Sequence, residues 1–300
     1  MKTLYFDCFS GISGDMVIGA LLDAGGDPQT LVEELKKLHF DDEYKLEWKK
    51  VVKNGITSTK FDVILKNEGN MHSHEHHHEQ EHDHEHHHHD HNHHHEHTHN
   101  HHHDDEHEHI HTHEHSHDHG HSHDHTHHHH HSHRAYKDIV KMIEESELAP
   151  EVKETSLKIF KKIGEAEGLI HGLPLDKVHF HEVGAVDSII DIVGAAILLD
   201  QLEITTIKSS AVPVGTGKIK IDHGIYPVPA PATLEILKGV PIEQNDIRFE
   251  LTTPTGAGII SVLTDEFCSF PSMKVEAIGY GAGTKTFKDR PNVLRIIIGE

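Results

Sequence analysis

The chain has 300 residues, a formal net charge of −23 and 41 histidines, 36 of which lie between His72 and His133. No apolar run is long enough to cross a bilayer. No patch of Lys and Arg interleaved with aromatics suggests a nucleic-acid partner. The two cysteines are far apart in the sequence and do not indicate a disulfide framework. The N-terminus does not resemble a signal peptide, because Asp7 and Asp15 interrupt any apolar segment. We therefore expect a cytoplasmic protein without a membrane or nucleic-acid partner.

Residues 1–70 are expected to form the first part of a folded α/β body. A short apolar strand, residues 3–6, runs into a glycine-containing turn and then into a helix over residues 15–24. This arrangement directs backbone N–H groups at an anion, and its carboxylates suit a phosphate held through a metal. Ordinary turn chemistry with a helix cap explains the pattern equally well. The candidate substrate- or phosphate-binding residues are Asp7, Ser10, Gly11, Ser13, Gly14 and Asp15.

A second helix and a β-hairpin follow in the same segment. Residues 28–38 have Pro28 at a position that helices accept in their first turn. Residues 44–53 and 56–65 alternate apolar and polar side chains around Asn54 and Gly55. An Asn-Gly pair between two such runs predicts a tight hairpin.

Residues 71–133 differ in kind from the rest of the chain. They contain 14 Asp and Glu residues and neither Lys nor Arg. Without an apolar face the tract cannot offset the entropy of ordering, so we expect it to be disordered. Imidazoles at this density bind borderline divalent ions such as nickel, copper and zinc, whereas the alternative is a solvated linker. Representative candidate ligands are His72, His86, His101, His117 and His133.

Residues 134–300 are expected to complete the folded body, and residues 178–199 contain its densest group of candidate ligands. If the start of this segment is extended, His179 and His181 lie on one face, because they are two residues apart. Asp187 and Asp191 are four residues apart and share one face of a helix. Asp191 lies among isoleucines and valines, where an unpaired carboxylate costs several kcal/mol. This pattern favours a metal or polyanion site over a buried structural network. The predicted metal ligands are His179, His181, Glu182, Asp187 and Asp191.

The remaining elements alternate between helices and strands. Helices are predicted over residues 136–145, 152–167 and 233–237, and a further helix is predicted to begin at residue 186. Strands are predicted over residues 204–214, 218–222, 274–279 and 293–298. His223, in a turn, is a further candidate metal ligand. Thr253, Thr255 and Gly256 precede a helix and form a second candidate phosphate site. We predict an α/β (α+β) fold with a mixed sheet and flanking helices, interrupted by a disordered His-rich insertion.

Five motifs in this order resemble the nickel insertion proteins that mature the nickel-pincer cofactor of lactate racemase. They are FDCFSGISGDM, HFHEVGAVDSIIDIVGAA, HGIYPVPAPAT, LTTPTGAG and GYGAG…RPNVLR, and the resemblance covers nearly all of the chain outside the tract. It implies a nickel chelatase of the lyase class that inserts Ni²⁺ into pyridinium-3,5-bisthiocarboxylic acid mononucleotide. Ni–S and Ni–C bonds form and protons are released.

The resemblance also implies partners. In that family the reaction is linked to CTP with Mn²⁺ or Mg²⁺, and members usually continue beyond the position of Glu300 with a part associated with nucleotide binding. A split or frameshifted gene would place that part on a separate C-terminal chain, which we expect as a partner together with the apo racemase.

Histidine and carboxylate can release nickel to the softer sulfurs of such a substrate. His179, His181 and Glu182 are therefore expected at the transfer site, with Glu182 as the catalytic base for the ring proton. Two alternatives remain open at this point. One is a non-enzymatic store or chaperone for nickel or zinc, and the other is a metal-dependent phosphoesterase with a metal-bound water.

Deleting residues 72–133 should lower the nickel stoichiometry several-fold but leave insertion at saturating nickel nearly unchanged. A flexible chain of 62 residues spans roughly 40–50 Å, so ions bound to it stay within reach of the folded body. Equilibrium dialysis and an insertion assay on both chains test this. A deletion chain that folds but inserts no nickel at any concentration would mean that the tract supplies catalytic ligands.

Overall fold

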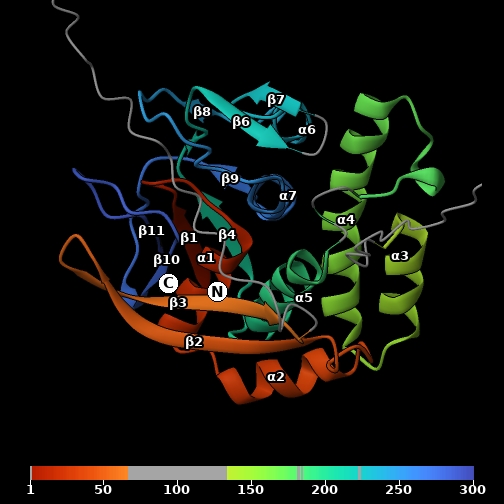
Figure 1. The fold of residues 1–300 in the computed structure, drawn as a ribbon. Helices are drawn as coiled ribbons and strands as arrows, with labels where there is room; N and C mark the ends of the chain where they lie inside the picture. The colour runs from red at the N-terminus through yellow and green to blue at the C-terminus, as the bar shows by residue number, and fades with distance from the viewer. Residues whose placement is uncertain (1, 67–133, 181–182, 184, 222–223) are drawn as a thin grey trace, which may run out of the picture. The chain divides into compact units, whose positions relative to one another are not determined.

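A mixed β-sheet forms the centre of the folded part of the chain (Figure 1). The computed structural model describes residues 2–66, 134–180, 183, 185–221 and 224–300. The histidine tract, and with it the expectation that the tract is disordered, lies outside these residues. The described residues on both sides of the tract belong to one compact unit.

The described chain contributes seven strands to this sheet. In spatial order they are β2 (Tyr44–Lys53), β3 (Ile56–Leu65), β10 (Val275–Ala282), β11 (Val293–Gly299), β1 (Thr3–Asp7), β4 (Thr206–Ser209) and β9 (Glu266–Phe267). β1 is antiparallel to β11 and parallel to β4, whereas β2 and β3 form an antiparallel hairpin. The predicted mixed sheet is therefore confirmed.

The register of the central strands places apolar side chains on one face. Leu4 pairs with Ile298 and Phe6 pairs with Ile296, and all four side chains belong to the main hydrophobic core. Because side chains alternate between the two faces of a strand, this register directs every second residue toward the helices.

Helices flank the sheet, as the sequence predicts. They are α1 (Gly14–Asp23), α2 (Pro28–Lys36), α3 (Tyr136–Glu145), α4 (Pro150–His171), α5 (Val186–Gln201), α6 (Pro231–Ile236) and α7 (Pro254–Leu263), with a 3₁₀ turn at Leu175–Lys177. α1 contacts β3 and β10 on one side and α5 on the other, and α4 packs against α5 and α7 (Figure 1).

Helix-end chemistry explains where several helices begin and end. Asp27 caps α2 by accepting the backbone N–H groups of Gln29 and Thr30. α4 extends beyond the predicted residues 152–167, because Pro150 suits its first turn and Gly172 ends it in a left-handed conformation with φ of 65°. The hairpin and α3 have the predicted bounds.

The strand predicted over residues 204–214 is wrong as a single element. It consists of β4 and of β5 (Val212–Pro213), which pairs with β8 (Ile242–Glu243) in a separate two-stranded sheet. After the break, the backbone N–H of Val212 donates to the carbonyl oxygen of Pro241, next to β8. The apolar run passes through the break, so periodicity alone did not reveal it. A second short sheet pairs β6 (Lys218–Ile221) with β7 (Gly224–Pro227).

Glycines bring the backbone of α1 directly against the sheet. A Cβ on Gly19 would lie 2.4 Å from the carbonyl oxygen of Thr59 in β3, and one on Gly281 would lie 1.8 Å from that of Met16. A Cβ atom cannot lie this close to a backbone oxygen, so no side chain fits at either position. α1 therefore lies closer to β3 and β10 than any other residue type would allow, and this contact fixes where its N-terminus lies.

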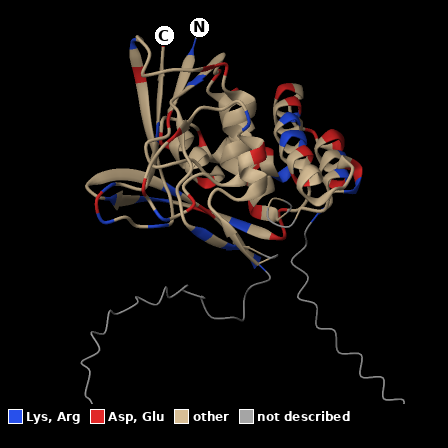
Figure 2. Cartoon of the chain, turned by 90° about the horizontal axis from the view of Figure 1, so that it is seen from above, with Lys and Arg blue, Asp and Glu red and all other residues tan. Residues whose placement is uncertain are grey.

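Charges of both signs are interspersed along the helices at the right of Figure 2, which include α3 and α4. Ion pairs at a spacing of four residues join Lys158 to Glu154 and Lys161 to Glu165. This pattern is typical of a solvated helix face. Within the described ranges, no helix is both long and apolar enough to cross a membrane.

Gly19→Ala should lower the free energy of unfolding by about 2 kcal/mol or more, because its Cβ meets backbone that cannot move away. Gly194→Ala in α5 is the matched control. Its Cβ would meet the flexible Cδ1 of Ile18 at 2.8 Å, and alanine is favoured over glycine in helices by about 1 kcal/mol, so stability should change little. Urea unfolding of both variants measures the difference. Equal stabilities would contradict the close packing of α1.

Candidate functional site

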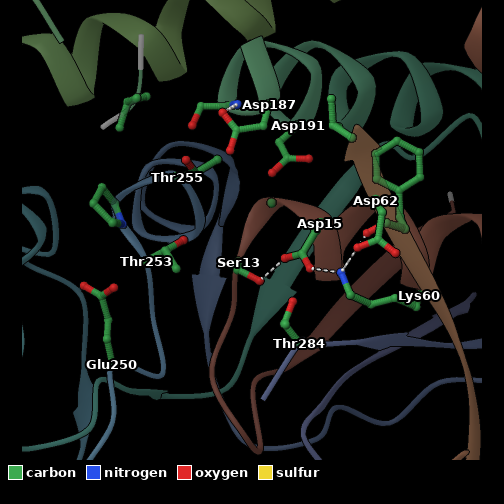
Figure 3. Close-up of a pocket in the computed structure, with 16 residues that line it drawn as sticks. Ser13, Asp15, Lys60, Asp62, Asp187, Asp191, Glu250, Thr253, Thr255 and Thr284 are labelled. Carbon is green, nitrogen blue, oxygen red and sulfur yellow. Dashed lines mark hydrogen bonds and ion pairs between the residues drawn. The ribbon is translucent and has the colours of Figure 1, made fainter. Parts of the chain in front are cut away.

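A cavity of about 400 Å³ opens where the N-termini of α1, α5 and α7 approach β3 (Figure 3). Such a volume lies in the range of small-ligand sites. The predicted residues that line it are Ser13, Gly14, Asp15, Asp187, Asp191, Thr253 and Thr255. The fold thus brings together residues from three motifs that are far apart in the sequence.

Gly14 lies against Asp191 where α1 meets α5. A Cβ at this position would lie 2.4 Å from the Cβ of Asp191 and 2.5 Å from its Oδ2. Only glycine leaves room for the Asp191 carboxylate beside the first turn of α1. The backbone amide of the next residue, Asp15, interacts with that carboxyl and slightly lowers its pKa.

Asp191 is enclosed and incompletely paired. Its Oδ1 is shielded from solvent and has no hydrogen-bond partner among the described residues. Burial raises the pKa of this carboxyl well above its ordinary value, and the negative charges of Asp15 and Asp187 raise it further. A carboxylate in this position favours a cation beside it.

Lys60 of β3 supplies a positive charge on one wall of the cavity. Its Nζ lies 2.8 Å from Oδ2 of Asp15 and 2.8 Å from Oδ1 of Asp62 (Figure 3). Burial by itself lowers the pKa of Lys60, but the two carboxylates outweigh burial and the pKa is raised. The ammonium group therefore stays charged and is held between two acids.

The first turn of α7 forms another wall. The hydroxyl of Thr253 accepts the backbone N–H of Gly256 at 3.2 Å and caps the helix. Pro254 has no N–H to donate. The backbone N–H of Thr255 lies in the first turn, where N–H groups have no acceptor within the helix. No acidic residue lies in this first turn, unlike the first turns of α1 and α5.

Carboxylates outnumber cations around the cavity. Asp15, Asp62, Asp187, Asp191 and Glu250 line it, and Lys60 is the one basic side chain among its described lining residues. This balance favours a cationic ligand or a metal ion. The helix N-termini favour an anion, so the cavity suits a ligand that carries both charges.

Four of the predicted phosphate-binding residues do not line the cavity. Asp7 accepts a hydrogen bond from Nε of Arg295 at 2.8 Å, and the Ser10 hydroxyl donates to the carbonyl oxygen of Pro291. A Cβ on Gly11 or Gly256 would meet the carbonyl oxygen of Leu251 at 1.9 Å or of Ile12 at 2.1 Å. Both glycines thus face neighbouring backbone.

His179 is exposed, lies outside the cavity lining and forms a β-bridge with Ala135, while its neighbours Val178 and Phe180 are buried. The other predicted metal ligands, His181, Glu182, His223 and the tract histidines, lie outside the described residues. Within the part of the chain that is described, no group of three His, Cys, Asp or Glu side chains is arranged to hold a metal ion.

Sequence reasoning missed several lining residues. Lys60 and Asp62 alternate with apolar residues in β3 and read as a solvent-facing edge, and Glu250 and Thr284 lie in unremarkable loops. The pairing of Lys60 with Asp15, 45 residues earlier, depends on α1 packing against β3. An isolated lysine in a hairpin strand carries no signal of this contact.

The sequence model of the family described as nickel insertion protein matches residues 4–300. The chain belongs to the nickel insertion protein family. The resemblance that the five motifs suggest is thereby confirmed.

Similar relatives of this nickel insertion family member are named pyridinium-3,5-bisthiocarboxylic acid mononucleotide nickel insertion protein. That of Geobacillus kaustophilus is 49% identical over 302 residues, 100% of this chain and 60% of the relative. Those of Staphylococcus epidermidis and Clostridium kluyveri are 43% and 44% identical, covering 99% and 100% of this chain and 59% and 62% of the relatives. The chain thus spans about 60% of the length of these relatives. No solved structure matches it.

Asp191→Asn should raise the melting temperature of the metal-free protein at pH 7.5 by a few degrees. A gain of about 1 kcal/mol in the free energy of unfolding corresponds to ~2–4 °C. The folded carboxyl has a pKa above the ordinary 3.8, so its ionisation opposes folding above pH 3.8. The advantage of asparagine should therefore shrink between pH 7.5 and pH 5.

Asp200→Asn, at the exposed end of the same helix, is the control and should not change the melting temperature. Calorimetric melting curves at both pH values measure the effect. A lower melting temperature for Asp191→Asn at pH 7.5 would mean that a partner stabilises the charged carboxylate.

Proposed function

We propose that this chain is a nickel chelatase that binds nickel and inserts it into pyridinium-3,5-bisthiocarboxylic acid mononucleotide. The match to the nickel insertion family carries the proposal, because residues 4–300 include every residue that lines the cavity. The names of the similar relatives supply the substrate. The product would be the nickel-pincer cofactor, for delivery to an apo lactate racemase.

The charge of the cavity supports the entry of nickel as a dication. A substrate with a phosphate and two thiocarboxylate groups is an anion at neutral pH, and five carboxylates line the cavity. Like charges at such short range repel each other. A nickel ion between protein carboxylates and substrate sulfurs would remove that repulsion, so metal and substrate should favour each other's binding.

Nickel transfer requires ligands that release the ion. We propose that His179, His181 and Glu182 hold it first, with Asp187 and Asp191 nearer the substrate. Val183, which follows Glu182 in the sequence, lines the cavity. The softer sulfurs of the substrate then outcompete imidazole and carboxylate for nickel. As the Ni–C bond forms, the ring C–H proton passes to a carboxylate, for which Glu182 is the candidate.

His179→Ala combined with His181→Ala should abolish nickel insertion and leave the fold intact, because the exposed His179 carries no core packing. Mass spectrometry of the prepared substrate after incubation with nickel measures insertion, and circular dichroism monitors the fold. His39→Asn is the matched control, since it removes a histidine away from the cavity at a φ of 59° that asparagine tolerates. Normal insertion by the double variant would place the transfer ligands elsewhere.

The part of the relatives that this chain does not span bears on the activity. We propose that CTP with Mn²⁺ or Mg²⁺ acts through that part, in agreement with the family resemblance. Insertion by this chain should be compared with insertion by a chain that carries the additional segment, with and without CTP. Nickel binding without transfer by both chains would favour a metal store. Phosphate release from simple esters that falls in Asp191→Asn would favour a phosphoesterase.

A further inference from the structure

Resting on the proposed function, we propose that the cavity binds the pyridinium mononucleotide in one orientation. The cationic ring lies against Asp191, and the phosphate lies at the N-terminus of α7. Asp191 is thereby assigned to ring recognition, and Thr255 to phosphate recognition.

The first observation concerns Asp191. The side chain of Asp191 lines the cavity, and its Oδ1 is shielded from solvent and has no hydrogen-bond partner among the described residues. The nitrogen of a pyridinium ring that carries a ribose has no hydrogen to donate, so the ring can approach a carboxylate only through its charge and its C–H groups. A cavity-lining carboxylate with an oxygen that lacks a donor is complementary in charge to such a ring. Val63 and Val183 provide apolar surface in the same cavity.

The second observation distinguishes the three helix N-termini at the cavity. At α1, the backbone amide of Asp15 already interacts with Asp191. At α5, the N–H of Ser188 donates to Oδ1 of Asp187 at 2.8 Å. Both first turns contain a carboxylate that repels phosphate, whereas the first turn of the ten-residue helix α7 contains none. The dipole of α7, the N–H of Thr255 and two threonine hydroxyls therefore form the preferred phosphate position.

The arrangement of the side chains agrees with this assignment. In Figure 3, Thr253, Thr255 and Glu250 lie on one side of the cavity, Lys60 and Asp62 lie on the other, and Asp191 projects between them. Two carboxylates already neutralise Lys60, so its ammonium does not compete with α7 for the phosphate. A ligand with a positive ring and a negative phosphate therefore matches the carboxylate of Asp191 at one end and the N-terminus of α7 at the other.

Three available probes separate the two ends of the ligand. Nicotinamide mononucleotide carries the pyridinium charge and the phosphate, its reduced dihydropyridine form lacks the ring charge, and nicotinamide riboside lacks the phosphate. Isothermal titration of the full chain in EDTA should give at least tenfold tighter binding for the first probe than for either of the others. Asp191→Asn should abolish the preference for the charged ring, and Thr255→Val should reduce the preference for the phosphate several-fold.

Matched controls lie at the far ends of the same helices. Asp200→Asn changes an exposed carboxylate of α5, and Thr264→Val removes a buried hydroxyl without a described partner after α7, so both should keep the two preferences. The inference is overturned if the wild-type chain binds none of the probes, if it binds charged and reduced rings equally, or if Asp191→Asn keeps the preference. These probes have no thiocarboxylates and cannot accept nickel, so their binding is independent of the insertion assay that tests the proposed function.

Discussion

The contact between α1 and its neighbours is the constraint on which the rest of the site depends. Glycines let the helix backbone touch β3 and β10 on one side and let Asp191 of α5 reach its first turn on the other. Close packing of this kind permits one relative placement of the elements, because any displacement opens voids or causes overlap. The same contact positions Asp15 beside Lys60, and so assembles the polar side of the cavity as a consequence of packing.

The negative charges that line the cavity repel one another. Asp191 is enclosed near two further carboxylates, while Lys60 is already shared between Asp15 and Asp62. Local conflicts of this kind are expected at functional sites, where a ligand relieves them. A metal dication or a cationic ring supplies the missing charge. The cavity differs in composition from the histidine tract, because its charged lining residues within the described part of the chain are five carboxylates and one lysine.

Much of this protein follows from local sequence patterns. The Asn54-Gly55 hairpin and helix α3 have the bounds that the sequence predicts, since each depends on residues close in the chain. The mixed sheet follows from the combination of a hairpin with alternating helices and strands. Asp191 is conspicuous in the sequence because a carboxylate among isoleucines and valines usually needs a partner. In the described part of the structure, its Oδ1 has none.

Only the tertiary structure decided which predicted residues meet. Ser10 and Ser13 look equivalent in the sequence, yet Ser10 donates to Pro291 and Ser13 lines the cavity. Lys60 gave no sequence signal at all, because its role comes from an ion pair across 45 residues. The break of the predicted strand after Ser209 likewise depends on pairing with β8. Local sequence determines periodicity, turns and caps, whereas long-range packing determines which side chains share a cavity, since no local pattern encodes distances between distant segments.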